Sequence, residues 1–190
     1  SPFDGSNQTT ITTSSSNDNS LAGSGAVYVY TRSGTTWSQE AYIKASSSDS
    51  NDGFGYNNIS LSGDTLAIGA HNEDSNQTTI TTSSSNDNSL ASSGAVYVYT
   101  RSGTTWSQQA YIKASNNKTE SYFGTSVGLD GDTLAVGAYD ENSNQTTITN
   151  GNTASDDTSK EASGAAYIFV RSGSNWSQIA YIKAVNADVS

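Results

Sequence analysis

The chain repeats itself almost without change, and this repetition limits the folds open to it. Residues 6–46 align with residues 75–115 at an offset of 69, and only two of the 41 positions differ. A third, more diverged copy begins at residue 143. The period exceeds the roughly 40–50 residues of common propeller blades, and the excess lies in one polar insert, residues 7–20 and 76–89. The two differing positions are Gly23/Ser92 and Glu40/Gln109.

Each full period carries signals for two β-hairpins, and helical periodicity appears nowhere. Residues 25–45 alternate with period two on both sides of a Ser33-Gly34 turn. Strict alternation puts Trp37 and Glu40 on opposite faces of the second strand. Residues 54–70 carry two short runs around Gly63-Asp64, a tight-turn pair. Two hairpins predict a four-stranded sheet, the size of a propeller blade. The first hairpin type is predicted at 24–45, 93–114 and 163–184, and the second at 53–70 and 122–138.

Two dipeptides mark the beginning and the end of the second hairpin type. Phe54-Gly55 is followed by Gly69-Ala70, and Phe123-Gly124 is followed by Gly137-Ala138. In these motifs, and in the wider string SGDTLAIGA…SGAVYVYTRSGTTWSQ, the chain resembles the FG-GAP repeat, bacterial extracellular subgroup. The resemblance implies propeller-type blades like those of integrin α subunits, an extracellular or cell-surface setting, and a role in adhesion, assembly or ligand display.

The chain departs from the family pattern at two places. His71 and Tyr139 stand where the family motif continues with Pro. The calcium loop of the integrins, with its alternating Asp-x-Asp-x-Asp-Gly spacing, is absent from the sequence.

The predicted fold class is all-β, with tandem four-stranded propeller-type blades in about 2.5 repeats of about 69 residues. Residues 1–47 form a half repeat, and residues 48–116 and 117–190 form two full FG-GAP-like repeats. A propeller needs at least ~4 blades to close, so the ring stays open and we expect neighbouring chains to complete the array. A chain without Met that begins Ser1-Pro2 is expected to be a processed segment, or a fragment of a longer array.

An unmatched hairpin leaves a sheet face and a strand edge without partners. A head-to-tail contact that does not close generates a filament. The first hypothesis is therefore an extracellular structural protein that assembles head to tail with copies of itself into a fibril or surface filament. The alternative is a calcium-dependent adhesin or carbohydrate-binding propeller module, which would be a stable monomer.

The composition excludes several classes of protein. Ser (35), Thr (23) and Asn (18) make up 40% of the 190 residues, and the formal net charge is −10. With no Cys, the chain has no disulfide framework and no zinc-thiolate site. The acid excess argues against nucleic acid as a partner, because phosphate contacts need clustered Lys and Arg. No apolar run approaches the ~20 residues that span a bilayer.

The acidic loops are candidate calcium sites. Calcium takes 6–8 oxygen ligands from carboxylates, amides and carbonyl groups, and loops rich in Asp, Asn and Gly supply such oxygens. The other interpretation is that these residues make turns and keep the surface soluble. The candidate ligands are Asp49, Asn51, Asp52, Glu73, Asp74, Asp87, Asp140, Glu141, Asp156 and Asp157.

Six Asn-x-Ser/Thr sequons are candidate glycosylation sites. Three of them are Asn-Gln-Thr at equivalent places in the inserts, each followed by an array of Ser and Thr hydroxyl groups that is typical of O-glycan acceptors. The other interpretation is an uncoated polar loop, in which the β-branched TTITT run is partly extended. The sequons are at Asn7, Asn58, Asn76, Asn117, Asn144 and Asn175.

The recurring aromatic residues are expected to pack between blades rather than to stack on sugars. They are Trp37, Trp106, Trp176, Tyr42, Tyr111 and Tyr181. The single His71 has Tyr139 at the equivalent place, so no repeated catalytic base exists. Asp64 and Asp132 follow Gly in hairpin turns, which explains them without glycosidase chemistry. The sequence therefore predicts that the protein is not an enzyme.

Overall fold

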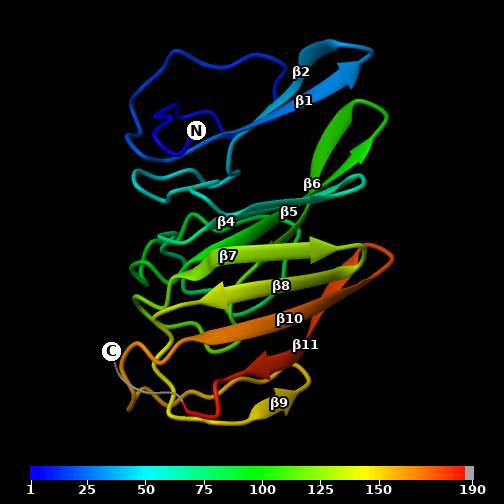
Figure 1. Cartoon of the computed structure of the whole chain (residues 1–190). Helices are drawn as coiled ribbons and strands as arrows, with labels where there is room; N and C mark the ends of the chain where they lie inside the picture. Colours follow the sequence, from blue (N-terminus) through cyan, green and yellow to red (C-terminus); the bar gives the residue numbers. More distant parts are fainter. Residues whose placement is uncertain (187–190) are drawn as a thin grey trace.

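The computed structural model describes residues 1–186, and this part of the chain is all-β, with eleven strands and no helix. Figure 1 shows three antiparallel sheets in a row, with the β1–β2 hairpin at one end and β11 with β9 at the other. The row does not close into a ring. The fold class predicted from the sequence is confirmed. The boundaries at 47/48 and 116/117 stay a prediction, and residues 187–190 of the last predicted repeat lie outside the described residues.

The predicted hairpins are all present. The first sheet pairs β1 (Val27–Ser33) with β2 (Thr36–Ile43). The second sheet has the order β3 (Ile59–Ser62), β4 (Thr65–Ala70), β5 (Ala95–Ser102) and β6 (Thr105–Ile112). The third has the order β7 (Phe123–Asp130), β8 (Thr133–Ala138), β10 (Ala165–Ser172), β11 (Asn175–Ile182) and β9 (Ile148–Asn150). The second and third sheets are complete blades. The first is a half-blade, for which residues 1–186 supply no strands equivalent to β3 and β4.

The polar inserts add to the outer edge of each sheet. In the first two copies a single residue pairs with the last strand, Thr12 with Tyr42 and Thr81 with Tyr111. In the third copy, β9 pairs with β11 over three residues, which include Thr149 opposite Tyr181. The β-branched run is thus extended in part, as the sequence suggested, because its residues suit a pleated edge.

A β-bulge breaks the strict alternation that the sequence suggested for the second strand of each hairpin. Val29 lies opposite Ala41 and Tyr30 opposite Gln39, so Glu40 is the extra residue. The same irregularity recurs in β5–β6 and β10–β11, where the extra residues are Gln109 and Ile179. A bulge changes the direction of the side chain of its extra residue. The prediction of strict alternation through Glu40 is therefore wrong.

The two apolar cores lie between consecutive sheets rather than inside any one of them. The first joins residues of β1 and β2 to Phe54, β4 and β5. The second joins β5 and β6 to Phe123, β8, β10 and β11. Phe54 lies edge-on to Tyr97, with ring centroids 5.3 Å apart, and Phe123 repeats this contact with Tyr167 at 5.2 Å. The blades therefore stabilise one another by stacking.

Candidate functional site

Each blade contacts the preceding one through a tryptophan. Trp106 on β6 donates its indole N–H to Oε1 of Glu40 at 2.8 Å, and Trp176 on β11 donates to Oε1 of Gln109 at 2.9 Å. Both acceptors are bulge residues, so the bulge aims the acceptor at the next blade. Arg101 stacks over the Trp106 ring with its guanidinium carbon 5.5 Å from the ring centroid. The predicted packing of these tryptophans between blades is confirmed, because their exposed fractions are 5% and 6%.

Trp37 is the exception, although the residues around it repeat those around Trp106. Its exposed fraction is 64%, because within residues 1–186 no sheet packs against this side of the half-blade. Tyr30 is 51% exposed, whereas its equivalent Tyr99 is 1% exposed. Within the described residues, no strand pairs with β1 in the way that β4 pairs with β5. We call the surface that carries Tyr30 and Trp37 the open donor face.

The opposite end of the row presents the complementary kind of surface. Ile179 is the bulge residue of β11, at the position of the acceptors Glu40 and Gln109, and it is 43% exposed. The carbonyl oxygen of Lys44 accepts a hydrogen bond from Tyr99 in the next blade at 3.2 Å, and Lys183 is the equivalent of Lys44 in the last blade. The side chain of Lys183 is buried, at 3% exposed, so Ile179 is the exposed residue of this surface, which we call the open acceptor face.

A buried carboxylate–lysine pair fastens each insert to its blade. Lys113 follows β6 and places its Nζ 2.6 Å from Oε2 of Glu73 and 2.8 Å from Oγ of Ser93. Tyr111 donates its hydroxyl to Oε1 of the same carboxylate at 2.6 Å. Burial lowers the pKa of Lys113 and the nearby Glu73 opposes this shift. Because an unpaired buried charge is very costly, the pair holds both ends of the insert to the strand.

The same centre occurs in the other two repeats. Lys183 contacts Oε2 of Glu141 and Oγ of Ser163, both at 2.7 Å. In the first repeat an aspartate takes the carboxylate position, and Lys44 lies 3.5 Å from Oδ1 of Asp4. The shorter aspartate gives a longer contact.

The predicted calcium ligands are scattered among several local roles. Glu73 and Glu141 bind the buried lysines. Asp156 pairs with Lys118 at 3.5 Å. Asp140 is half-buried after β8. Among residues 1–186, no group of three or more His, Cys, Asp or Glu is placed to hold a metal ion. Asp74, Asp87 and Asp157 accept backbone N–H groups from Ser92, Asn76 and Asn144 at 2.6, 2.9 and 2.8 Å.

Three of the candidates do lie together before Phe54. Asp52 is 2% exposed and accepts the backbone N–H of Asp49 at 2.9 Å. Asn51 adopts a left-handed backbone with φ 70°, and its carbonyl oxygen accepts a bond from Asn72 at 3.0 Å. Burial raises the pKa of Asp52 to about 8, and the nearby Glu73 adds to the shift. Calcium at these loops stays a prediction.

The six sequons divide into two groups. Asn58 and Asn117 are 2% and 8% exposed, and their side-chain nitrogens donate to backbone carbonyl oxygens, Asn58 to Gly124 at 2.7 Å and Asn117 to Ser75 at 2.9 Å. A glycan needs that same nitrogen, so these two sites do not fit glycosylation of the folded chain. The other four, Asn7, Asn76, Asn144 and Asn175, are exposed and stay candidates.

His71 lies within a row of aromatic rings. Its ring centroid is 5.7 Å from that of Tyr56 and 6.3 Å from that of Tyr122, and burial lowers its pKa.

Asp64 and Asp132 lie in hairpin turns, as the sequence indicated. They accept hydrogen bonds from Arg101 and Arg171 at 2.8 and 2.7 Å.

No helix within residues 1–186 has the length and apolar character needed to cross a membrane.

A search of curated proteins found no match to the chain. The family model described as FG-GAP repeat matches twice, over residues 37–99 and 106–169, which together make up more than half of the chain. This family consists of non-enzymatic repeats that are typical of extracellular or surface proteins. The hairpin order, the interblade packing and these two matches together show that the chain belongs to the FG-GAP repeat family.

Proposed function

We propose that the protein is an extracellular or cell-surface structural repeat that associates head to tail, with the open donor face of one chain docked on the open acceptor face of the next. The observation that carries the proposal is the exposed fraction of Trp37, which is 64% against 5% for Trp106 although their local sequences are nearly the same. The surface around Trp37 has nearly the same residues as the surface around Trp106, which packs against another blade in this chain. The surface around Trp37 is therefore suited to pack against a blade as well.

A second copy of the chain suits the open donor face because the acceptor face is part of the chain. The docked chains would repeat the interface between the half-blade and the second sheet. In that interface, Trp106 and Tyr99 of the second sheet contact residues of the half-blade. Ile179 replaces the Glu40 or Gln109 acceptor, so Trp37 would pack on an apolar side chain without an indole hydrogen bond. The proposed contact is therefore weaker than the internal ones, because an indole N–H is left without its acceptor.

The proposal includes two additions that the sequence suggested. Glycans on the exposed Asn7, Asn76, Asn144 or Asn175 would coat the inserts, which lie along the outer edges of the sheets. Calcium near Asp52 would offset the cost of burying its carboxylate.

Sedimentation velocity over a range of concentrations tests the association. We expect wild-type chains to form concentration-dependent oligomers, which electron microscopy would show as filaments. Trp37→Ala should leave the melting temperature unchanged and abolish association. Ile179→Gln should strengthen association, because it restores the acceptor found at Gln109. A chain that stays monomeric at every concentration, with and without calcium and in the Ile179→Gln variant, would overturn the proposal.

A further inference from the structure

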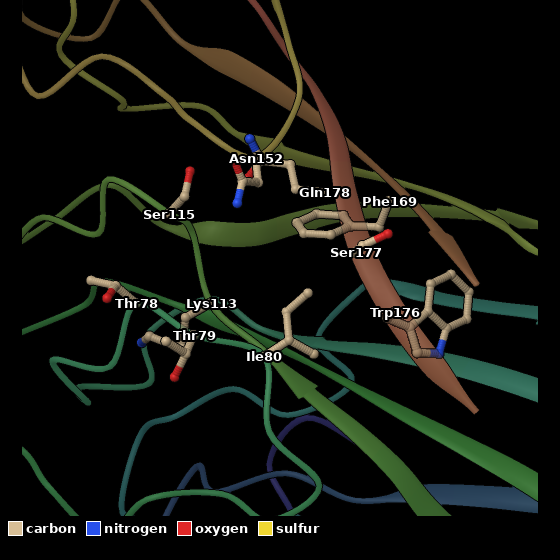
Figure 2. A pocket seen from close by; sticks show the side chains of 10 residues that line it. All are labelled: Thr78, Thr79, Ile80, Lys113, Ser115, Asn152, Phe169, Trp176, Ser177 and Gln178. Atoms are coloured by element: carbon tan, nitrogen blue, oxygen red, sulfur yellow. The ribbon is translucent and has the colours of Figure 1, made fainter. Parts of the chain in front are cut away.

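A cavity of about 270 Å³ lies between the second and third sheets. It is bounded by the insert of the second repeat, the insert of the third repeat and strands β10 and β11. In Figure 2, Ser115, Asn152 and Gln178 gather in the upper part of the view, and Ile80 and Trp176 lie below them. The lining residues are Thr78, Thr79, Ile80, Lys113, Ser115, Asn152, Phe169, Trp176, Ser177 and Gln178.

The equivalent place between the half-blade and the second sheet is closed by hydrogen bonds. Oγ of Ser46 lies 2.7 Å from Oε1 of Gln108 and 2.6 Å from Oγ of Ser84. The hydroxyl of Tyr99 donates to the carbonyl oxygen of Lys44 at 3.2 Å. These contacts join the two blades directly.

At the cavity, the equivalent atoms are left without partners. Oγ of Ser115 and Oε1 of Gln178 are both buried, and neither has a hydrogen-bond partner among residues 1–186. Gln178 is only 7% exposed, and its side-chain nitrogen is turned to the carbonyl oxygens of Gly151 and Thr153, at 3.4 and 3.2 Å. Phe169 replaces Tyr99 and has no hydroxyl to donate to Lys113. Buried polar atoms normally find partners, so these two side chains offer hydrogen bonds to a molecule that enters the cavity.

The third insert explains why this interface opens. Asp157 follows Asn144 by 13 residues, whereas Asp87 follows Asn76 by 11, so the loop is longer. Its extended part pairs with β11 as β9 and then turns at Gly151, where φ is 98°. The longer loop therefore pairs with β11 of its own sheet. As a result, Ser115 has no neighbouring hydroxyl group in the place where Ser84 contacts Ser46.

The chemistry of the lining selects a neutral, hydroxyl-rich ligand with one apolar face. Phe169, Trp176 and Ile80 form an apolar wall. The ammonium group of Lys113 is already bound to Glu73 and Ser93, so no free charge is left to attract an ion. Gln178 offers an acceptor that needs a donor. The volume is several times the ~30 Å³ share of one water molecule and suits a single sugar ring.

We propose that this cavity binds one neutral hexose unit of a glycan. The ring's C–H face lies on the apolar wall at Ile80 and Trp176, and its hydroxyls donate to Oε1 of Gln178 and bond Oγ of Ser115. The site is independent of head-to-tail association, since it lies inside one chain.

Saturation-transfer difference NMR on the full chain tests this, with the methyl glycosides of glucose, galactose and mannose as probes and glycerol as the small-polyol control. We expect at least one glycoside, and not glycerol, to receive saturation. Phe169→Tyr copies the residue of the neighbouring interface, so it should fold normally, fill the cavity and weaken binding by roughly tenfold or more. Ser115→Ala should weaken binding without changing the melting temperature, because that hydroxyl has no partner in the protein.

Trp37→Ala is the matched control that should bind as the wild type does. No signal from any of the three glycosides, an equal signal from glycerol, or undiminished binding by both Phe169→Tyr and Ser115→Ala would overturn the proposal. In the first case the cavity holds ordered water only.

Discussion

Gly69 at the end of β4 lies directly against the carbonyl oxygen of Gly124 in the next blade, and a Cβ atom on Gly69 would overlap that oxygen. Asn58 donates to the same oxygen at 2.7 Å. Gly69 belongs to the Gly-Ala dipeptide of one repeat and Gly124 to the Phe-Gly dipeptide of the following repeat. The two halves of the family motif are therefore the two sides of one contact between consecutive blades.

Gly69→Ala should destabilise the chain by about 1–3 kcal/mol, because the added methyl group must push backbone against backbone. Gly128→Ala in β7 is the matched control, since an added Cβ there meets nothing within 4 Å. Urea unfolding of both variants measures the difference. Equal midpoints would show that the blades can separate at Gly69 without cost.

Lys113→Met should cost about 3–5 kcal/mol, because it leaves the buried carboxylate of Glu73 without its cation. The side chains of Lys113 and Glu73 are 0% and 3% exposed. Lys44→Met should cost less, because Asp4 is more exposed, at 10%, and lies 3.5 Å from its lysine. Thermal unfolding of the two variants gives the comparison. A larger loss of stability in Lys44→Met than in Lys113→Met would contradict this prediction.

Asp52→Asn should stabilise the chain at neutral and alkaline pH. The folded pKa, about 8, is above the ordinary 3.8, so between these values the folded state holds a proton that the unfolded state has released. Stability from this group is therefore present at low pH and is lost as the pH rises toward 8, by up to about 1.4 kcal/mol per pH unit. Urea unfolding in EDTA from pH 4 to 9 should show a flatter profile for the variant.

Added calcium gives a second result in the same experiment. If calcium stabilises the wild type above pH 7 and leaves Asp52→Asn unchanged, the predicted metal role of this loop gains support. Ser121 occupies the equivalent position in the next repeat, so Asp52→Ser should behave as the Asn variant does. Identical pH profiles for wild type and variants would contradict the raised pKa.

The sequence predicted the hairpins because turn pairs and period-two runs are local signals. It could not predict the bulge at Glu40, because a bulge is defined by the pairing of two strands. The sequence of a single strand does not show which residue has no partner opposite it. The Glu73–Lys113 pair joins residues far apart in the chain, and only its recurrence as Glu141–Lys183 and Asp4–Lys44 could have revealed it. The exposure of Trp37 could not be predicted either, because its local sequence is nearly the same as that of the buried Trp106. The two differ in whether another sheet among residues 1–186 packs against them.

The tryptophan contact gives the row of blades a polarity. Trp106 donates to Glu40 and Trp176 to Gln109, in both cases from the later blade to the earlier one. A contact made of two unlike halves cannot lie on a two-fold axis, where both partners must present the same patch. A fibre that reuses it has every chain pointing one way, with an indole at one tip and Ile179 at the other. Subunits would then join and leave the two tips at different rates, and a molecule that blocks one tip would leave the other free to grow.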